Sequence, residues 1–317
     1  MAENSAISWT THTWNPWMGC TKVSPACDGC YAEALMDKRY GKVKWGPHGE
    51  RVRTGAHTWN DPKRWQRQAE KDGSRPFVFC ASLADLFDNQ VPADWRREAF
   101  DVMRATPNLV YLLLTKRPQN ILKMAGEAGG LPRNAAIGTT VEDQKRADQN
   151  VYHLIRAKYA LKPVFAFLSC EPLLGPIEVE DITEIDWVIT GGETDQGGHK
   201  ARPTHPNWFR SLRDQCARYG IPFHHKQNGE WADYKTVGGN GWEFTKERDG
   251  RRYGRVLAGD IGSSTPMFDG REFETVYPWP EDSIHWSANP CMIRVGKHLS
   301  GRRLDGVEHN EFPEVRP

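Results

Sequence analysis

The chain has 317 residues, enough for one large α/β domain with appendages, and it needs no disulfide bonds to bury a core. Its 42 Lys and Arg against 41 Asp and Glu give a formal charge of +1, which excludes a protein that coats nucleic acid or anionic membrane through its overall charge. No apolar run is long enough to span a bilayer, and the first residues, MAENSAISWT, do not resemble a signal peptide. We therefore expect a cytoplasmic protein with no membrane partner.

Three of the seven cysteines lie close together, at Cys20, Cys27 and Cys30. An odd number of cysteines, three of them in one short loop, favours a metal site in a reducing compartment over a disulfide framework. Pro25 and Gly29 supply turns that can wrap this loop around a ligand. A structural zinc site is normally closed by four protein ligands. A four-iron cluster held by three cysteines instead leaves one iron open to a substrate or cofactor.

Two alternatives remain open for these thiols. One is a zinc site that takes its fourth ligand from His12 or Cys80. The other is that the three thiols are unconnected. The further cysteines Cys80, Cys170 and Cys216 stand in apolar or helical surroundings, which is typical of core residues.

Residues 38–75 form a basic segment with no clear periodicity. It holds 11 Lys and Arg against 4 Asp and Glu, with Trp45, Trp59 and Trp65 between them. Such a mixture can grip phosphates and stack on bases. The alternative is a solvated basic insertion whose tryptophans plug into the domain.

From about residue 77 the sequence alternates short apolar runs with amphipathic stretches, the pattern expected of βα units around a parallel sheet. We expect strands at 77–81, 109–114, 135–140, 164–169, 187–190 and 221–225, and helices at 93–104, 142–158 and 206–219. Five or six units are too few for a closed eight-unit barrel, so the sequence predicts an α/β fold with a partial (βα) barrel.

Polar residues follow each expected strand, where parallel α/β folds place their chemistry. These residues are Ser82 and Asp85, Thr115 and Lys116, Glu142, Glu171, Glu193, and Lys226 with Gln227. Helix caps and turns are the alternative explanation for each one singly. Together they favour a polar site at one mouth of the barrel.

The expected domain organisation is a barrel over residues 1–229 and an extension over 230–317. The barrel carries the cysteine loop at 20–30 and the basic insertion at 38–75. The extension is rich in Gly, Trp and charge, with short strand-like pieces, and we expect it to cover the barrel.

The cysteine loop and its flanks, TWNPWMGC at 13–20 running into CDGCYAE at 27–33, resemble a family of phage and prophage proteins related to radical S-adenosylmethionine (SAM) enzymes. The similarity continues far downstream. It includes SLADLF at 82–87, LTKRP at 114–118, TVEDQ at 140–144, CEPLLG at 170–175, GGE at 191–193, KQ at 226–227, RVGK at 294–297 and LDG at 304–306.

Two strand ends, 82–85 and 115–116, are also similar to stretches of spore photoproduct lyase, a radical SAM enzyme that repairs a thymine lesion in DNA. The cysteine spacing departs from the usual pattern of that superfamily, which is three residues, then two, with an aromatic residue before the last cysteine. Here the first gap is six residues, Gly29 takes the aromatic position, and Tyr31 follows the last cysteine.

The resemblance implies a partial barrel of the radical SAM type and two cofactors. A [4Fe–4S] cluster would be held by Cys20, Cys27 and Cys30, and its open iron would bind SAM. Cleavage of SAM would then give a deoxyadenosyl radical that abstracts a hydrogen atom from the substrate, which demands a dry, closed site.

The resemblance also suggests roles for the polar strand ends. Candidate SAM contacts are Ser82, Asp85, Thr115, Lys116 and Glu171, and candidate substrate contacts are Glu142, Glu193, Lys226 and Gln227. Structural pairing, such as a Lys226–Glu193 salt bridge across the mouth, is the alternative. Cys80 and Cys170 are candidate hydrogen-atom donors, because both fall near strand ends.

The phage character of the family favours a nucleic-acid base as substrate. The reaction expected is isomerisation of an amino-acid-type adduct on a modified thymine, during DNA hypermodification that evades host restriction. The implied partners are the modified nucleobase or DNA and an electron donor such as flavodoxin or ferredoxin, in the host cytoplasm if a phage encodes the chain. Two alternatives stay open: a radical SAM enzyme that modifies a peptide or partner protein, and a non-catalytic zinc-binding or nucleic-acid-binding module.

Overall fold

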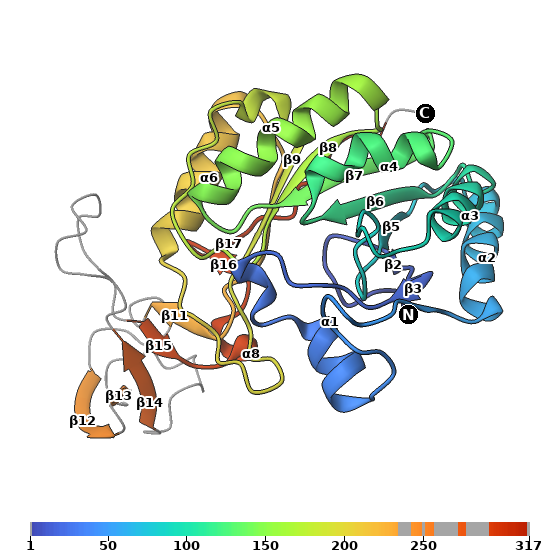
Figure 1. Cartoon of the computed structure of the whole chain (residues 1–317). Coiled ribbons are helices and arrows are strands. Elements are labelled where there is room, and N and C mark those ends of the chain that lie inside the picture. Colours follow the sequence, from blue (N-terminus) through green and yellow to red (C-terminus); the bar gives the residue numbers. More distant parts are fainter. Residues whose placement is uncertain (1, 234–241, 249–250, 257–271, 277–291, 316–317) are drawn as a thin grey trace.

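The computed structural model describes residues 2–233, 242–248, 251–256, 272–276 and 292–315. Its main sheet has the strand order β1-β2-β5-β6-β7-β8-β9-β10. The strands are β1 (Ala2–Glu3), β2 (His12–Thr13), β5 (Phe77–Cys80), β6 (Val110–Thr115), β7 (Ala135–Thr140), β8 (Ala166–Cys170), β9 (Trp187–Gly191) and β10 (Phe223–Gln227). Only β1 is antiparallel to its neighbour. The seven parallel strands curl into a half-barrel (Figure 1), which confirms the prediction of an α/β partial barrel.

Five helices cover the outer face of this sheet (Figure 1). They are α2 (Ala56–Asp72), α3 (Ala93–Arg104), α4 (Ile121–Glu127), α5 (Gln144–Leu161) and α6 (Pro206–Tyr219). Local signals set their ends. The Asp143 carboxylate caps α5 by accepting the Arg146 backbone N–H at 2.8 Å, and Gly220 ends α6 with a φ of 67°. None of the described helices is long and apolar enough to cross a membrane.

The sheet separates two apolar cores because side chains alternate between its faces. The larger core fills the space between the sheet and the helices. The smaller one, on the concave face, is mostly aromatic and consists of Trp9, Phe79, Val110, Leu112, Ala136, Phe165, Phe167, Trp187 and Ile189. Gly138 makes room for it, because a Cβ there would lie 2.4 Å from the Phe167 ring. The Phe312 ring covers the base of this core, with its centroid 5.4 Å from that of Trp187.

After β10 the chain adds an antiparallel sheet and then returns to the barrel. The sheet has the order β11-β15-β14-β13-β12, with β11 at Trp231–Asp233, β12 at Trp242–Arg248, β13 at Arg251–Val256, β14 at Glu272–Val276 and β15 at Met292–Arg294. Helix α8 (Lys297–Ser300) and the hairpin of β16 (Arg303–Leu304) and β17 (Val307–Glu308) follow. The Asn228 side chain ties the end of α8 to the barrel by donating to the Ser300 carbonyl at 2.8 Å. Much of the predicted extension lies outside the described residues, and its role as a cover stays a prediction.

Candidate functional site

The loop from Cys20 to Cys30 lies at the carboxyl ends of the barrel strands. It runs between β3 (Trp17–Met18), which pairs with β4 (Val52–Arg53), and α1 (Tyr31–Glu33), which continues as a π-helical segment at Ala34–Arg39. Just before the loop, the Gly19 backbone N–H donates to the Leu83 carbonyl at 3.1 Å, in the turn that follows β5. Cys27 is buried, and the other two thiols are half-buried. The sequence therefore delivers all three thiols to the mouth of the barrel.

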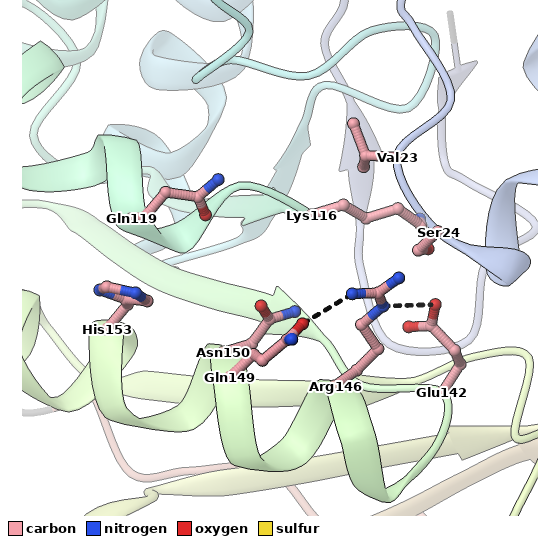
Figure 2. A pocket seen from close by; sticks show the side chains of 9 residues that line it. All are labelled: Val23, Ser24, Lys116, Gln119, Glu142, Arg146, Gln149, Asn150 and His153. Atoms are coloured by element: carbon pink, nitrogen blue, oxygen red, sulfur yellow. Dashed lines mark hydrogen bonds and ion pairs between the residues drawn. The ribbon is translucent and has the colours of Figure 1, made fainter.

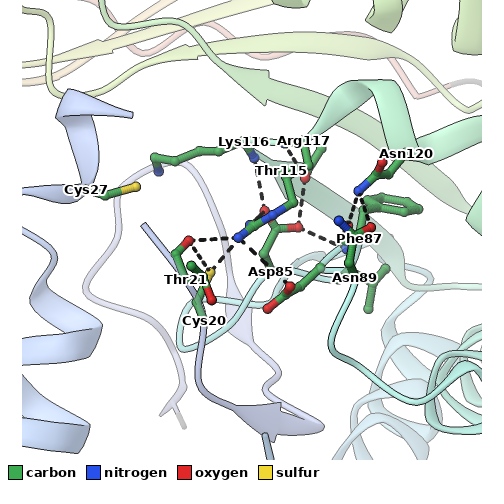
Figure 3. Close-up of polar contacts among 12 residues, drawn as sticks. Cys20, Thr21, Cys27, Asp85, Phe87, Asn89, Thr115, Lys116, Arg117 and Asn120 are labelled. Atoms are coloured by element: carbon green, nitrogen blue, oxygen red, sulfur yellow. Dashed lines mark hydrogen bonds and ion pairs between the residues drawn. The ribbon is translucent and has the colours of Figure 1, made fainter. Parts of the chain in front are cut away.

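An arginine at the end of β6 holds the first part of this loop (Figure 3). The Arg117 guanidinium donates to the Thr21 carbonyl at 2.7 Å and lies 3.5 Å from Cys20 Sγ. Asp85 fixes the guanidinium from below at 2.9 Å and also accepts from the Thr115 hydroxyl at 2.7 Å. Burial lowers the pKa of Arg117, but the charges of Asp85 and Cys20 outweigh it and raise that pKa. We call Asp85, Thr115 and Arg117 the inner anchor; all three are buried.

A second arginine holds the later part of the loop. The Arg202 guanidinium donates to the Pro25 carbonyl at 3.0 Å and to the Asp28 carboxylate at 3.2 Å. Glu193, after β9, accepts from Arg202 at 2.6 and 2.8 Å and lies 3.1 Å from His199 Nε2. Burial raises the pKa of Glu193, yet its hydrogen bonds from Arg202 and His199 outweigh burial and hold that pKa below its usual value. We call Glu193 and Arg202 the outer anchor.

Gly29 has no room for the aromatic residue that the superfamily pattern would place there. A Cβ at this position would lie 2.7 Å from the His199 ring and 3.1 Å from a Glu193 oxygen. Tyr31, two residues later, links the loop to the turn after β5, because its hydroxyl donates to the Ser82 carbonyl at 2.6 Å. The Ser82 hydroxyl itself is engaged by the Asn15 side chain at 3.0 Å.

Lys116 and Glu142 approach the middle of the loop. The Glu142 carboxylate is almost fully buried and accepts from the Ala26 backbone N–H at 3.4 Å. The Lys116 side chain extends toward the loop (Figures 2 and 3). Burial lowers the pKa of Lys116, but the charges of Cys27, Cys30 and Glu142 outweigh burial and raise it. The ends of β6, β7 and β9 thus all reach the cysteine loop.

A separate polar group crosses the opposite side of the mouth. Lys226 Nζ lies 3.0 Å from Glu171, which also accepts from Trp9 Nε1 at 3.2 Å. Gly191 lets Glu171 lie against the backbone, since a Cβ there would be 2.7 Å from Glu171 Oε1. Lys226 therefore pairs with Glu171, whereas Glu193, its partner in the alternative drawn from the sequence, is held by Arg202. The Gln227 amide donates to the Gly192 carbonyl at 3.2 Å.

The three thiols of the loop are the type of ligand that zinc and iron–sulfur clusters take. Three thiols face the cationic side chains of Lys116 and Arg117, and positive charge favours the thiolate form that binds metal. As the loop stands, burial raises the pKa of Cys20 to about 12 and also raises that of Cys30. Across the described ranges, no three His, Cys, Asp or Glu side chains already meet at one point. Binding of a cluster would therefore require deprotonation and a local closure of the loop.

The other candidate ligands and thiols lie away from this group. The His12 ring stacks on Trp65, with centroids 4.4 Å apart, and Cys80 is fully buried. A zinc site completed by either residue has no support from this placement. Cys80 and Cys170 both belong to the core between sheet and helices, where burial raises the pKa of each thiol. Their role as hydrogen-atom donors stays a prediction that this placement does not favour.

The second half of the basic segment is mainly a helix of the outer layer of the barrel. Residues 56–72 form α2, whose Trp59 and Trp65 side chains are buried. Arg51 is buried as well and donates to Asp88 at 2.8 Å. The Arg53 guanidinium lies over the Trp59 ring, 3.8 Å from its centroid. These contacts favour, for Trp59 and Trp65, the alternative in which the tryptophans plug into the domain, and they leave Trp59 unable to stack on a base. Trp45 is half-buried, and its contact with a base stays a prediction.

Two functional candidates escaped the reasoning from sequence, Arg117 and Arg202. Arg117 stands in the polar run after β6, directly beside Thr115 and Lys116, so its position was a usable signal. Arg202 lies in a segment without a recognisable motif. Its role depends on the fold bringing residues 25–28 next to β9.

No curated protein matches the sequence significantly. A solved structure of a spore photoproduct lyase mutant aligns over 69% of this chain and 75% of its own, with 10% sequence identity and a TM-score of 0.43. This likeness is too distant to carry a functional argument. Residues 4–313 match the family described as a protein of unknown function, DUF5131. Because this match spans nearly the whole sequence, the chain belongs to the DUF5131 family.

Proposed function

We propose that this chain is a radical SAM enzyme, with a [4Fe–4S] cluster on Cys20, Cys27 and Cys30 and SAM at the open iron. The observation that carries the proposal is the three-thiol loop held over the carboxyl-end mouth of a half-barrel by side chains from the segments that follow β6, β7 and β9. When bound, the cluster and SAM supply a radical that abstracts a hydrogen atom from the substrate.

The residues of the mouth have three tasks in this proposal. The two anchors position the loop, so Asp85 and Thr115 act through Arg117 rather than on a cofactor. Lys116 is the candidate for the SAM carboxylate, because its ammonium faces the loop between the anchors. Glu171, polarised by Lys226, is the candidate for the ribose or amino group of SAM.

The concave core keeps the site dry below these polar groups. Trp9, Phe167 and Ile189 form an apolar floor on the inner face of the sheet. Such a floor excludes water from the site, so the charges at the mouth act in an environment of low dielectric constant.

For the substrate we propose an amino-acid-type adduct on a modified thymine, which the enzyme isomerises during hypermodification of phage DNA, with flavodoxin or ferredoxin as electron donor. The hydrogen atom taken from the adduct returns after the attachment has moved, so the composition of the base is unchanged. This choice rests on the family resemblance. A peptide substrate is the alternative that the experiments below separate.

The cluster is tested by anaerobic purification and iron–sulfide reconstitution. We expect brown protein with about four irons per chain, lost in Cys20→Ala, Cys27→Ala and Cys30→Ala. Cys216→Ala is the matched control, since this thiol lies in the core. Stoichiometric zinc, with no broad visible absorbance after reconstitution, would remove the proposal.

The reaction class is tested with dithionite-reduced, cluster-loaded protein. We expect slow cleavage of SAM to 5′-deoxyadenosine without substrate and faster cleavage with modified thymidine, whose adduct should convert without a change of mass. Intact SAM on a reduced cluster contradicts the enzyme class. Cleavage without conversion of any modified thymidine, free or in DNA, favours the peptide alternative.

A further inference from the structure

A polar cavity of about 330 Å³ opens beside the cysteine loop, between that loop, the turn after β6 and helix α5 (Figure 2). Lys116 lies on the loop side, and Arg146, Gln149 and His153 line it from α5. Its volume is in the range of small-molecule sites.

The cavity carries more positive than negative charge. Lys116 and Arg146 are its cations, and Glu142 is the acid that lines it. Glu142 is already engaged, because it accepts from the loop backbone at Ala26 and lies 3.7 Å from Arg146 Nε. Lys116 makes no ion pair with a carboxylate in the part of the chain that the structure describes.

The Arg146 guanidinium is held in place, but not all of its N–H donors have an acceptor among the described residues. One terminal nitrogen donates to Gln149 Oε1 at 2.7 Å, while the buried Nε has no hydrogen-bond partner among the described residues. A guanidinium presents five N–H donors in a planar fork that matches phosphate oxygens. Gln149, on α5, and Gln119, in the turn after β6, add neutral amide donors from two sides of the cavity. With Lys116 assigned to the SAM carboxylate, the open N–H donors of Arg146 and the two glutamine amides remain, and they favour an anionic ligand.

We propose that this cavity binds a phosphate group of the substrate, with Arg146 as the principal contact and Glu142 as the residue that orients the guanidinium. The inference rests on the proposed function, since it names the substrate class, a nucleoside phosphate, for the same mouth. The phosphate belongs either to a free nucleotide or to a DNA backbone. The cavity borders the cysteine loop, so a phosphate bound there places the attached nucleoside beside the radical site.

The test compares two arginines of the same helix. Arg146→Gln removes the proposed contact, and Arg156→Gln is the matched control, because Arg156 lies over the neighbouring Tyr152 ring. Calorimetric titration of the reconstituted enzyme uses three probes: thymidine, thymidine 5′-monophosphate and a short oligothymidylate. We expect Arg146→Gln to weaken binding of the phosphate-bearing probes by about tenfold or more, with thymidine unchanged. The control should bind all three like the wild type.

The two phosphate probes separate the possible sources. Weaker binding of both phosphate probes by Arg146→Gln indicates a nucleotide phosphate. Weaker binding of the oligonucleotide alone indicates the DNA backbone, and the salt dependence of that binding should then fall by about one unit of slope. Gln149→Glu, which adds a carboxylate without truncating Arg146, should weaken the same probes and serves if Arg146→Gln fails to fold. Wild-type affinity of both variants for both phosphate probes overturns the inference, as does absence of phosphate-probe binding to the wild type.

Failure here is distinguishable from failure of the proposed function. Iron content and SAM cleavage are measured on the same preparations. A wild type that carries the cluster and cleaves SAM, yet binds neither phosphate probe, refutes the phosphate site alone. Phosphate binding that depends on Arg146 in a protein that never holds a cluster refutes the radical SAM assignment alone.

Discussion

The inner and outer anchors hold the same loop with the same chemistry, an arginine fixed by a carboxylate, but they differ in burial. In the inner anchor the side chains of Arg117 and Asp85 are 6% and 7% exposed. In the outer anchor Glu193 is 3% exposed, whereas Arg202 is 35% exposed. The Arg202 guanidinium can turn into water while Glu193 keeps the Arg202 backbone N–H at 2.8 Å and His199 at 3.1 Å, whereas a displaced Arg117 guanidinium has no such access to water and would leave both charges of its pair buried. The Pro25–Asp28 part of the loop is therefore the part that can move more easily.

The largest effect expected is that acid weakens the side of the outer anchor first. Burial lowers the pKa of His205, His224 and His225 to about 4 from the ordinary 6.5. The unfolded chain therefore takes up protons first, so stability falls as the pH falls from about 6.5 to about 4 and these groups cause no further loss below that. Up to roughly 3 kcal/mol per histidine is involved. Hydrogen exchange at pH 7, 5.5 and 4.5 should show protection falling in β10 and the start of α6.

Strands β6 and β7, next to the inner anchor, are the internal reference for this measurement. If their protection falls in step with that of β10, the two sides are not energetically distinct. Equal protection of β10 at pH 7 and 4.5 would show that the three histidines are not buried in the neutral form.

Removing the arginine of the inner anchor is the next largest perturbation. Arg117→Met leaves the Asp85 carboxylate buried without its counter-charge, and we expect the free energy of unfolding to drop by about 3–5 kcal/mol. Urea denaturation measures this. Arg97→Met, at an exposed ion pair on α3, should cost under about 0.5 kcal/mol and is the control. A loss below about 1 kcal/mol in Arg117→Met would contradict the asymmetry between the anchors.

Substitution of the arginine of the outer anchor should lower the stability less and should loosen one part of the loop. Arg202→Gln should cost about 1–2 kcal/mol, because the guanidinium is partly solvated. In metal-free, reduced protein, mass spectrometry should show faster alkylation of Cys27 and Cys30 with Cys20 unchanged. Arg210→Gln, which removes a similarly exposed guanidinium from its ion pair with Asp305, is the matched control. Equal acceleration at all three thiols would mean that the loop opens as one unit.

The smallest effect concerns the exposed lysines of the basic segment. Lys42→Ala with Lys44→Ala should change the free energy of unfolding by less than about 0.5 kcal/mol, since both residues lie on the surface. The sequence predicts that this segment contacts DNA. If it does, the slope of the logarithm of oligonucleotide affinity against the logarithm of salt concentration should fall by about one unit for each phosphate that the variant no longer binds. An unchanged slope refutes that prediction and leaves α5 as the phosphate-binding face.

Elements with strong local signals were predicted well from the sequence. The helices at 93–104 and 206–219 and the strand at 135–140 have the predicted bounds. Strand β10 begins two residues later than expected, because Pro222 has no N–H for the ladder. Helix α2 was missed, since Pro62 lies inside it and its buried positions are spaced among many charges. Strand β2 has only two residues, too few to show a period.

The site was less predictable because its contacts join distant segments. The residue types at the strand ends pointed to Asp85, Thr115 and Glu193. In the structure these residues support Arg117 and Arg202, which contact the cysteine loop. It did not find what they bind, because the pairing of Glu193 with Arg202 rather than Lys226 depends on how the chain from 194 to 205 folds back. Sequence pattern identifies which residues reach the mouth, and only tertiary structure decides how they pair.

The position of Phe312 has a consequence for folding during synthesis on the ribosome. Its ring covers Trp187 and Phe77 at the base of the half-barrel, yet it is translated long after the last barrel strand, β10. At roughly 5–20 residues per second the nascent barrel waits several seconds with these aromatic rings uncovered. Transiently exposed apolar surface favours aggregation, so this end of the half-barrel is most prone to aggregate before residue 312 docks.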